Sequence, residues 1–217
     1  MEDAKKIYMG FELIHGNDMA EEIRRLQKAK TFTEKDAAKM IHQVLLGLNY
    51  MHASDIIHRD IKPENVMIHK TGEGHDDFVC KITDFGLACK YDHENPPKMY
   101  CGSFAFIAPE ILEGIPYDTK VDVWALGVMT YNILTGKLPY LGKNKTNQIA
   151  LIRGKPLNPK LFKGYLEEGK PALDFIERCL TIKPKNRADI AELLNHRWIK
   201  KMAGQDGEFD QGDLVQI

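Results

Sequence analysis

The sequence predicts a mainly α-helical domain with a few short β-strands, and three patterns lead to this fold class. Thr33 is the expected N-cap of a helix by its residue type. After it, apolar or half-apolar side chains recur three and four positions apart and share one helix face: Ala37, Ile41, Val44, Leu45, Leu48 and His52. Residues 121–134 are apolar on nearly every side, as in a helix at the centre of a core. Two short apolar segments, 65–68 and 78–82, flank a polar, glycine-containing loop and indicate a β-hairpin.

The remaining elements follow from turn and capping residues. Residues 6–14 are apolar and aromatic, so we expect a strand there, followed by a turn at residues 15–18 and a short helix. Asp118 is the expected cap of a central helix that runs through Tyr131, and Gly136 should end this helix. Two further helices are expected, at residues 171–180 and 189–196.

Composition restricts the class of protein. A chain of 217 residues with 43% hydrophobic and 28% charged residues suits one medium-sized, soluble domain. The formal net charge is -1, so the overall charge attracts neither nucleic acid nor a membrane surface. Basic residues are scattered apart from small clusters at residues 5–6 and 183–187, which we expect to be solvated. The N-terminal residues lack a signal-peptide pattern, and residues 121–134 are too few to span a bilayer.

The cysteines and histidines do not form a recognisable metal pattern. Cys80, Cys89, Cys101 and Cys179 include no Cys-x-x-Cys pair, and a disulfide framework would be sparse for this length. We therefore expect reduced thiols and a cytoplasmic or nuclear location. Residues 69–77 contain two histidines and three acids, but their spacing matches no standard metal site, so a solvated loop is favoured.

Two short motifs carry the chemistry. Residues 58–65 are His-Arg-Asp-Ile-Lys-Pro-Glu-Asn, and residues 84–86 are Asp-Phe-Gly. Three further motifs follow in order: Ala-Pro-Glu at 108–110, Asp-Val-Trp-Ala-Leu-Gly at 122–127, and Arg187 ahead of His-Arg-Trp-Ile at 196–199. This ordered set resembles the catalytic domain of eukaryotic-type protein kinases and covers most of the chain, from about residue 6 to residue 200.

The resemblance implies transfer of the γ-phosphoryl group of ATP, with magnesium, to a protein hydroxyl. Asp60 would accept the hydroxyl proton, and Lys62 would meet the transferring phosphoryl oxygens. Asn65 would offer magnesium a neutral oxygen and Asp84 a charged one, as suits this hard cation. The alternative is a kinase fold kept without catalysis, and the four intact residues argue against it.

The resemblance also implies a nucleotide site. Glu12 to Ile14 would form the hinge whose backbone bonds the adenine edge, with Phe11 as the bulky residue behind it. Met67 would form the apolar floor under adenine, or pack in the core, or do both. Asp18 would reach the ribose of the nucleotide.

Other matches bear on the substrate. The Lys-Pro-Glu-Asn form at residues 62–65 resembles serine/threonine kinases, and Ser103 stands where that class commonly has a threonine that reaches the catalytic Asp and Lys. Glu64 and Asp18 match acidic positions that pair with an arginine upstream of the phosphosite in basophilic kinases. A solvated carboxylate is the open alternative at both places. Asn132 replaces a second glutamate of some basophilic kinases, so a second arginine is not expected.

Five further matches are architectural. Glu110 and Arg187 would form a buried ion pair that ties the activation segment to the helical base. Asp122 would anchor the catalytic loop from the central helix. His58 and Phe85 would stack on each other.

One departure from the family concerns activation. Arg59 normally meets a phosphate on the activation segment, yet Met99 stands where many relatives carry a phosphothreonine. The sequence therefore predicts activation without loop Ser/Thr phosphorylation, with Asp92 or Glu94 as the negative partner of Arg59. Cys-Gly-Ser at residues 101–103 resembles the calcium/calmodulin-dependent kinase group, but no basic amphipathic helix follows, so calcium control is not implied.

The expected domain boundaries follow from what precedes the motifs. No glycine-rich loop and no Val-Ala-Ile-Lys strand occur, so residues 1–202 are expected to form a kinase C-terminal lobe with its hinge strand, without the N-terminal β lobe. Residues 203–217 are expected to be a disordered tail. A truncated catalytic domain is favoured over a natural lobe-only protein, and a partner chain would cover the exposed cleft. The alternative function is a non-catalytic binding module or scaffold.

Overall fold

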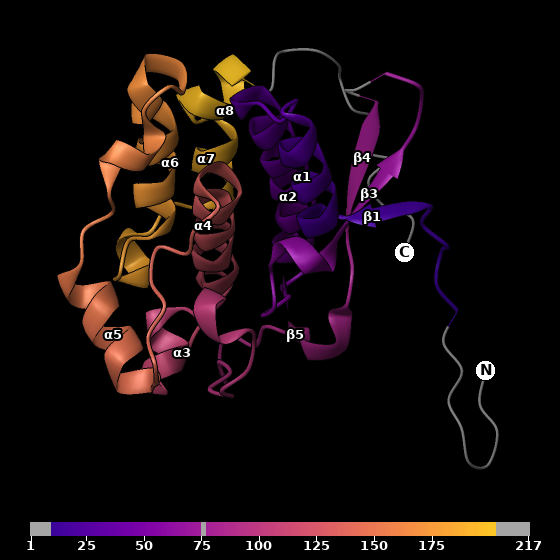
Figure 1. Ribbon diagram of the computed structural model, residues 1–217. Coiled ribbons are helices and arrows are strands. Elements are labelled where there is room, and N and C mark those ends of the chain that lie inside the picture. Colours follow the sequence, from indigo (N-terminus) through magenta and orange to yellow (C-terminus); the bar gives the residue numbers. More distant parts are fainter. Residues whose placement is uncertain (1–9, 75–76, 203–217) are drawn as a thin grey trace.

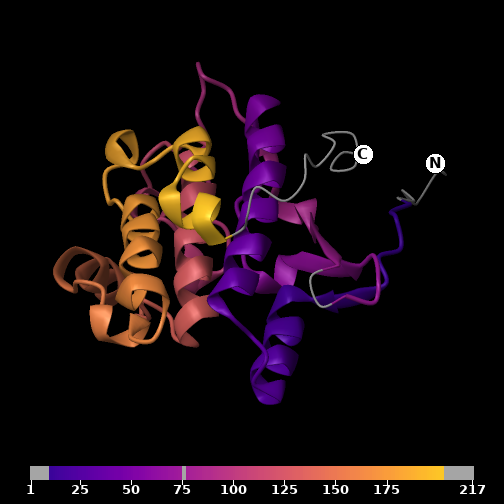
Figure 2. The same cartoon turned by 90° about the horizontal axis from the view of Figure 1, so that it is seen from above.

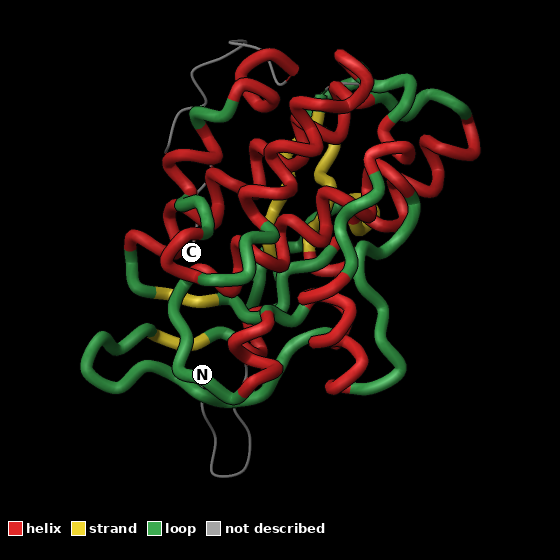
Figure 3. Tube along the Cα trace, turned by 90° about the vertical axis from the view of Figure 1, so that its left-hand side faces the viewer, coloured by secondary structure: helices red, strands yellow, loops and turns green. Residues whose placement is uncertain are grey.

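The computed structural model describes residues 10–74 and 77–202. These residues contain eight α-helices: α1 Met19–Ala29, α2 Glu34–Ala53, α3 Pro109–Glu113, α4 Lys120–Thr135, α5 Lys145–Gly154, α6 Lys170–Cys179, α7 Ile190–Leu194 and α8 Arg197–Met202. They also contain five short strands: β1 Gly16–Asp18, β2 Ile56–Ile57, β3 Val66–Lys70, β4 Phe78–Ile82 and β5 Cys89–Lys90. The predicted tail at residues 203–217 lies outside the described residues. The mainly α-helical fold class is confirmed for the described part of the chain (Figure 3).

The helices are arranged around α4. Helix α4 packs against α2 on one side and α6 on the other, and the strands β1, β3 and β4 lie beyond α2 (Figures 1 and 2). Thirteen of the sixteen residues of α4 are buried, which explains why this helix is apolar all round. Helix α4 therefore forms the centre of the core from which the neighbouring helices are positioned.

Helix α2 begins where its capping residues predict. The Thr33 hydroxyl accepts a hydrogen bond from the Asp36 amide at 3.2 Å, and the Asp36 carboxylate accepts one from the Thr33 amide at 2.7 Å. This reciprocal capping box satisfies amides that the first helical turn leaves unpaired. The predicted apolar face of α2 is buried, and the helix carries the chain towards residue 58.

Helix α4 extends further than the sequence predicts. The Asp118 carboxylate accepts a hydrogen bond from the Lys120 amide at 2.8 Å, so Asp118 does bond the first turn. The helix ends at Thr135 rather than Tyr131, because Gly136 adopts a left-handed conformation with φ of 66° and its amide donates to the Asn132 carbonyl. The predicted role of Gly136 as the terminator is confirmed.

The first strand differs from the prediction. Residues 10–14 form no strand, and β1 lies at Gly16–Asp18, where a turn was predicted. Strand β1 pairs with β3 in antiparallel register, with Gly16 opposite His69. A Cβ on Gly16 would lie 1.9 Å from the Ile68 carbonyl oxygen, so this glycine permits close approach of two strands. The glycine was therefore a sign of strand packing and not of a turn.

Strands β3 and β4 form the predicted hairpin, with Val66 opposite Ile82 and Lys70 opposite Phe78. Gln43 of α2 fixes this hairpin to the helical core. Its side-chain nitrogen donates to the Phe78 carbonyl at 3.1 Å, and its side-chain oxygen accepts from the Cys80 amide at 2.6 Å. Because Gln43 occupies the free edge of β4, the sheet is joined to α2 by hydrogen bonds as well as by apolar contact.

A buried ion pair joins distant parts of the chain. The Arg187 guanidinium bonds both carboxylate oxygens of Glu110, at 2.7 and 3.0 Å. Its remaining N–H groups donate to three carbonyl oxygens, those of Lys120, Thr181 and Ile182. The pair is desolvated, since the side chain of Arg187 is 0% exposed. The predicted ion pair is confirmed, and it connects α3, α4 and the segment that precedes α7.

No described helix has both the length and the apolar character that crossing a bilayer requires.

All four cysteines are free thiols: Cys80, Cys89, Cys101 and Cys179. Burial raises the pKa of the Cys80 and Cys179 thiols far above the ordinary value, so these two sulfurs remain protonated and inert.

Replacing Arg187 with Met should lower the free energy of unfolding by about 3–5 kcal/mol, because Glu110 would remain buried without its partner. Urea denaturation followed by circular dichroism measures this loss. The control is Arg178→Met, which breaks an exposed pair with Asp174 and should cost less than about 1 kcal/mol. Equal losses in the two variants would contradict the assigned importance of the buried pair.

Candidate active site

The segment that follows β2 is held in place by one buried carboxylate. Asp122 of α4 accepts hydrogen bonds from the amides of His58 and Arg59, both at 2.9 Å. Nε2 of His52 also lies 2.9 Å from Asp122. Arg59 adopts a positive φ of 69°, an unfavourable conformation for a side chain of this size. The anchor predicted at Asp122 is thus present, and it stabilises the turn that presents Asp60.

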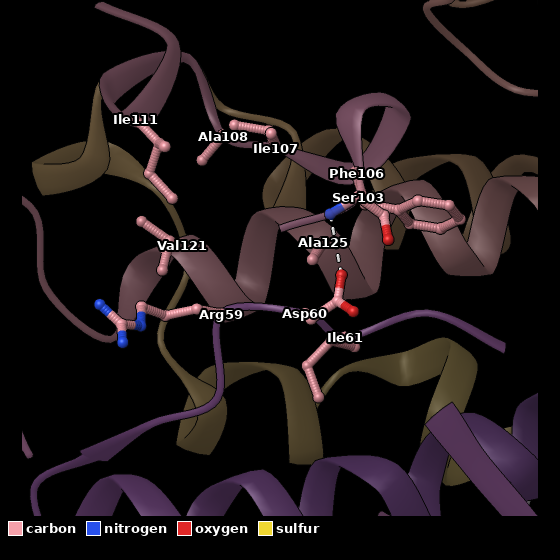
Figure 4. A pocket seen from close by; sticks show the side chains of 10 residues that line it. All are labelled: Arg59, Asp60, Ile61, Ser103, Phe106, Ile107, Ala108, Ile111, Val121 and Ala125. Carbon is pink, nitrogen blue, oxygen red and sulfur yellow. Dashed lines mark hydrogen bonds between the residues drawn. The ribbon is translucent and has the colours of Figure 1, made fainter. Parts of the chain in front are cut away.

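The structure brings Asp60, Lys62 and Ser103 together. Nζ of Lys62 donates to Asp60 Oδ2 at 2.8 Å and to Ser103 Oγ at 2.7 Å. The Ser103 amide donates to Asp60 Oδ1 at 2.8 Å, a contact visible in Figure 4. Nδ2 of Asn65 donates to Asp60 Oδ2 at 3.0 Å and to the Asp60 carbonyl at 2.8 Å. Both carboxylate oxygens of Asp60 are therefore oriented by fixed donors.

This environment controls the ionisation of Asp60. Burial opposes the charged form, but hydrogen bonds from Lys62 and Ser103 outweigh burial and hold the pKa of Asp60 below its usual range. The carboxylate is therefore ionised at neutral pH. A carboxylate held in this state, whose side chain keeps 9% of its surface exposed, is able to accept a hydrogen bond from an incoming hydroxyl.

The chain around Gly102 closely approaches the turn that carries Asp60. Gly102 has φ of 98°, and a Cβ at this position would lie 2.6 Å from the Arg59 carbonyl oxygen. A larger residue would therefore meet both backbone strain and a steric clash. The close approach places the amide of the next residue, Ser103, against Asp60.

Beside Asp60 lies a small apolar pocket. Figure 4 shows Asp60 and Ser103 at one side of it, with the Arg59 side chain extending in the opposite direction. The remaining lining residues are aliphatic or aromatic: Ile61, Phe106, Ile107, Ala108, Ile111, Val121 and Ala125. The polar groups therefore meet at the edge of a dry surface, where hydrogen bonds and charges act more strongly than in water.

The two residues predicted to bind magnesium lie at the open end of the β3–β4 hairpin. Asn65 directly precedes β3 and Asp84 follows β4 by two residues. The chain segments are joined there, since the Thr83 amide donates to the Asn65 carbonyl at 2.9 Å. The Asn65 amide nitrogen is engaged by Asp60, which leaves its side-chain oxygen as the group for a cation.

The donor chemistry at this end of the hairpin fits magnesium. Asp84 is exposed, with φ of 61°, and its carboxylate accepts only a weak hydrogen bond, from the Gly86 amide at 3.3 Å. Among the described residues no cluster of three or more His, Cys, Asp or Glu side chains forms a protein-only metal cage. Magnesium is commonly held by one or two protein oxygens together with substrate phosphates, so the pair Asn65 and Asp84 suits it.

The predicted nucleotide residues gather around the three-stranded sheet. Asp18, Met67 and Lys81 stand opposite one another in β1, β3 and β4, so their side chains share one face. Nζ of Lys81 binds both carboxylate oxygens of Glu12, at 2.6 and 2.7 Å. Ile14 is half-buried in the irregular segment before β1. The hinge strand predicted around Glu12 and Ile14 is wrong for residues 10–14, although these residues do lie beside the sheet.

The acidic residues predicted to meet a substrate arginine differ from each other. Asp18 caps α1, because its carboxylate accepts a hydrogen bond from the Glu21 amide at 2.8 Å. Glu64 is exposed in the short 3-10 turn before β3, and no ion pair involves it within the described residues. Of the two, Glu64 is therefore the carboxylate that remains available. Asn132 lies near the end of α4 and donates to the Lys137 carbonyl.

His58 and Phe85 are in contact, with ring centroids 5.2 Å apart in an edge-on arrangement. The imidazole Nε2 of His58 lies 3.0 Å from the Thr83 carbonyl. The predicted contact between these rings is confirmed. It connects the segment around Asp60 to the segment that carries Asp84.

The predicted acidic partner of Arg59 is wrong. Arg59 donates to the Leu87 carbonyl at 2.5 Å and to the Tyr117 hydroxyl at 3.3 Å, and among the described residues it forms no ion pair. Asp92 instead caps its own turn by accepting from the amide of Glu94 at 2.8 Å. A local hydrogen bond across two residues competes successfully with a distant cation.

Sequence reasoning missed Tyr117. This residue is buried, and its hydroxyl donates to the Met99 carbonyl at 2.9 Å while accepting from Arg59. Burial raises the pKa of Tyr117 to about 12, so its hydroxyl keeps its proton at physiological pH. The available signal was a tyrosine directly before Asp118, but its position does not reveal which carbonyl it would meet.

Comparison of the sequence with known proteins finds protein kinases. A family model described as a protein kinase domain matches residues 1–199. A serine/threonine-protein kinase H1 homolog of Danio rerio is 39% identical over 212 residues, which cover 93% of this chain and 47% of the relative. Serine/threonine-protein kinase H1 of Homo sapiens is 37% identical, with 93% and 46% covered.

A sperm motility kinase 3A of Mus musculus is 34% identical over 206 residues, which cover 94% of this chain and 38% of the relative. The chain thus spans about half, or less, of the length of these curated relatives. The family model matches far more than half of this chain, and the motif residues occupy one connected site. The chain belongs to the protein kinase family.

Proposed function

We propose that the chain is the catalytic-loop part, or C-terminal lobe, of a serine/threonine protein kinase that transfers the γ-phosphoryl group of ATP. The observation that carries this proposal is the network in which Lys62, Ser103 and Asn65 all donate to the Asp60 carboxylate. A purely structural aspartate needs no lysine shared with a serine hydroxyl at the edge of an open pocket. The similarity to serine/threonine-protein kinase H1 supports serine/threonine kinase activity.

In the proposed mechanism, Asp60 orients the substrate hydroxyl and accepts its proton as the oxygen attacks phosphorus. Lys62 lies 2.8 Å from Asp60 and places its positive charge beside the oxygens of the transferring group. The Ser103 hydroxyl holds Lys62 in this position. Asn65 and Asp84 would hold magnesium, which would supply positive charge against the nucleotide phosphates.

We place the nucleotide base over Met67, next to the segment that contains Glu12 and Ile14. The face shared by Asp18 and Met67 supports this placement, since it offers an apolar floor with a carboxylate at its side. Asp18 would accept a hydrogen bond from the ribose with the carboxylate oxygen that the helix cap leaves available.

The substrate in this proposal is a protein serine or threonine with an arginine upstream. Glu64 supports it, as an exposed carboxylate four residues beyond Asp60. Resemblance to the calcium/calmodulin-dependent group and a cytoplasmic or nuclear location belong to the same proposal. So does a further polypeptide over the nucleotide face, where Phe11, Leu13 and Phe85 are 79%, 75% and 49% exposed.

Asp60→Asn should lower phosphoryl transfer at least about a hundredfold, because the amide cannot accept the hydroxyl proton. The assay is transfer from labelled ATP with magnesium to a serine peptide that carries an upstream arginine. Asp55→Asn, five residues earlier and with a side chain that is 48% exposed, is the control and should leave transfer unchanged. Equal activity in Asp60→Asn would contradict the proposed role. A folded wild-type chain without transfer would favour the alternative, a non-catalytic binding module.

Asp84→Ala should weaken divalent-cation binding at least about tenfold, because one of two proposed ligands is lost. Mn²⁺ is a suitable paramagnetic probe, and broadening of the amide signals of residues 65 and 84 reports its position. The control is Asp77→Ala, at the other end of the hairpin, where the carboxylate accepts from the Gly74 amide. Unchanged broadening in Asp84→Ala, or equal loss in the control, would contradict the site.

We also propose that the activation segment is ordered without phosphorylation, through Arg59 and Tyr117. The Tyr117 amide donates to the Pro97 carbonyl and its hydroxyl donates to the Met99 carbonyl, so one residue holds the segment at two points. Arg59 completes the connection to Leu87 at the start of the same segment. The guanidinium of Arg59, which a phosphate would otherwise bind, thereby donates its hydrogen bonds to uncharged acceptors.

Tyr117→Phe should speed hydrogen exchange of the amides of residues 98–103 by about fivefold, since a buried hydrogen bond of about 1 kcal/mol is lost. Tyr100→Phe is the control, because that side chain is 51% exposed. Phosphatase treatment of the native protein should leave exchange unchanged. Faster exchange after phosphatase treatment would show that a phosphate, and not Tyr117, orders the segment.

A further inference from the structure

The chain between α4 and α6 has an uneven distribution of charge. From residue 123 to residue 166 there is no aspartate or glutamate, although the whole chain has a formal net charge of -1. The same stretch contains seven basic residues, which we call the basic flank: Lys137, Lys143, Lys145, Arg153, Lys155, Lys160 and Lys163. All seven side chains are exposed. The positive charge is thus a local property that the net charge conceals.

Helix α5 and the segment that connects it to α6 carry five of the seven residues of the basic flank, and both lie along one edge of the molecule. Helix α5 lies at the lower left edge in Figure 1, and the segment that connects it to α6 continues along that edge. The short 3-10 turn Pro159–Phe162 packs on both α4 and α6, with Phe162 buried. The backbone that carries these lysines is therefore fixed on the core.

The charges of the basic flank are mostly not neutralised by the protein. Arg153 pairs with Glu113 at 2.6 Å, but none of the six lysines takes part in an ion pair within the described residues. Glu167, which borders the flank, is already engaged by Lys201 at 3.0 Å. That hydrogen bond from Lys201 lowers the pKa of Glu167, as expected for a carboxylate whose charge is already balanced.

The fold itself does not require these positive charges. Asn144 caps α5 by accepting from the Asn147 amide at 2.9 Å, and Asn158 caps the next turn by accepting from Lys160 at 3.1 Å. Gln148 accepts from the Gly142 amide at 2.5 Å. Aspartate caps a helix as well as asparagine does. The capping positions 144 and 158 are therefore filled by neutral residues although acidic residues would serve equally well. The local absence of acids preserves a positive surface.

We propose that the basic flank docks an acidic segment of a partner protein, rich in aspartate and glutamate. Exposed Leu141, 63% exposed and two residues before Lys143, offers an apolar contact that a peptide side chain can use. Nucleic acid is the less favoured ligand, because bases stack on exposed aromatic rings. The aromatic side chains of this stretch are covered: Trp124, Tyr131, Tyr140 and Phe162 are buried, and Tyr165 is half-buried.

The docked segment would lie close to the proposed active site. Helix α5 packs on α3, and Ile111 of α3 lines the pocket beside Asp60. A protein bound to the flank would therefore present its neighbouring residues near the catalytic loop at a raised local concentration. Docking itself does not rest on phosphoryl transfer, so binding is measured without ATP.

The test is fluorescence anisotropy with a labelled twelve-residue peptide of alternating acidic and small residues. A matched peptide with Asn and Gln in place of the acids, and a single-stranded RNA of equal charge, are compared with it. The flank variant carries Lys143→Glu, Lys145→Glu and Lys155→Glu. The control carries Lys28→Glu, Lys90→Glu and Lys185→Glu, which are exposed lysines elsewhere, so both variants have the same net charge.

We expect the flank variant to weaken binding of the acidic peptide at least about tenfold, and the control less than about threefold, because each exposed ion pair contributes only a few-fold. The neutral peptide should not bind, and added salt should weaken binding of the acidic peptide. Circular dichroism establishes that both variants are folded. Equal losses in the two variants, or tighter binding of the RNA than of the acidic peptide, would overturn the proposal.

Discussion

The site depends above all on the buried carboxylate of Asp122. Two backbone amides and an imidazole point at it, and this attraction stabilises a turn in which Arg59 adopts a positive φ. Such a conformation costs on the order of 1–3 kcal/mol unless its surroundings enforce it. The turn directs Asp60 towards Ser103 (Figure 4), and it directs Arg59 towards Tyr117. Both the reactive carboxylate and the order of the activation segment therefore follow from one charge at the first turn of α4.

The rest of the site is distributed over elements that are each fixed by a separate interaction. Gln43 attaches the hairpin to α2, and the ion pair of Arg187 with Glu110 attaches α3 to the helical base. The apolar core sets the distances between helices, whereas these few polar contacts set the orientation of the segments that carry the chemistry. This division explains why reactive side chains lie in short irregular segments although the molecule is mainly helical.

The helices were predictable because their signals are local. Thr33 and Asp36 lie within one turn, and the apolar spacing of α2 is visible over its whole length. The members of the candidate site were predictable from the motifs, but their partners were not. Arg59 finds Leu87 and Tyr117 through folding, and no sequence pattern ranks these neutral acceptors above Asp92. The basic flank is hard to recognise in the sequence, because its basic residues are spread out and its signal is the long absence of aspartate and glutamate.

The two ends of the β3–β4 hairpin have different roles: one end positions Asn65 and Asp84, and the other only connects the strands. Its open end holds Asn65 and Asp84 in fixed register, while residues 71–77 connect the strands at the far end. The paired strands fix the positions of Asn65 and Asp84, so the length of the connection between the strands does not alter the spacing of these two proposed cation ligands. An inserted tag or reporter domain between residues 71 and 77 would therefore leave the ligands undisturbed, whereas a one-residue insertion within β4 would shift its register and move Asp84 away from Asn65.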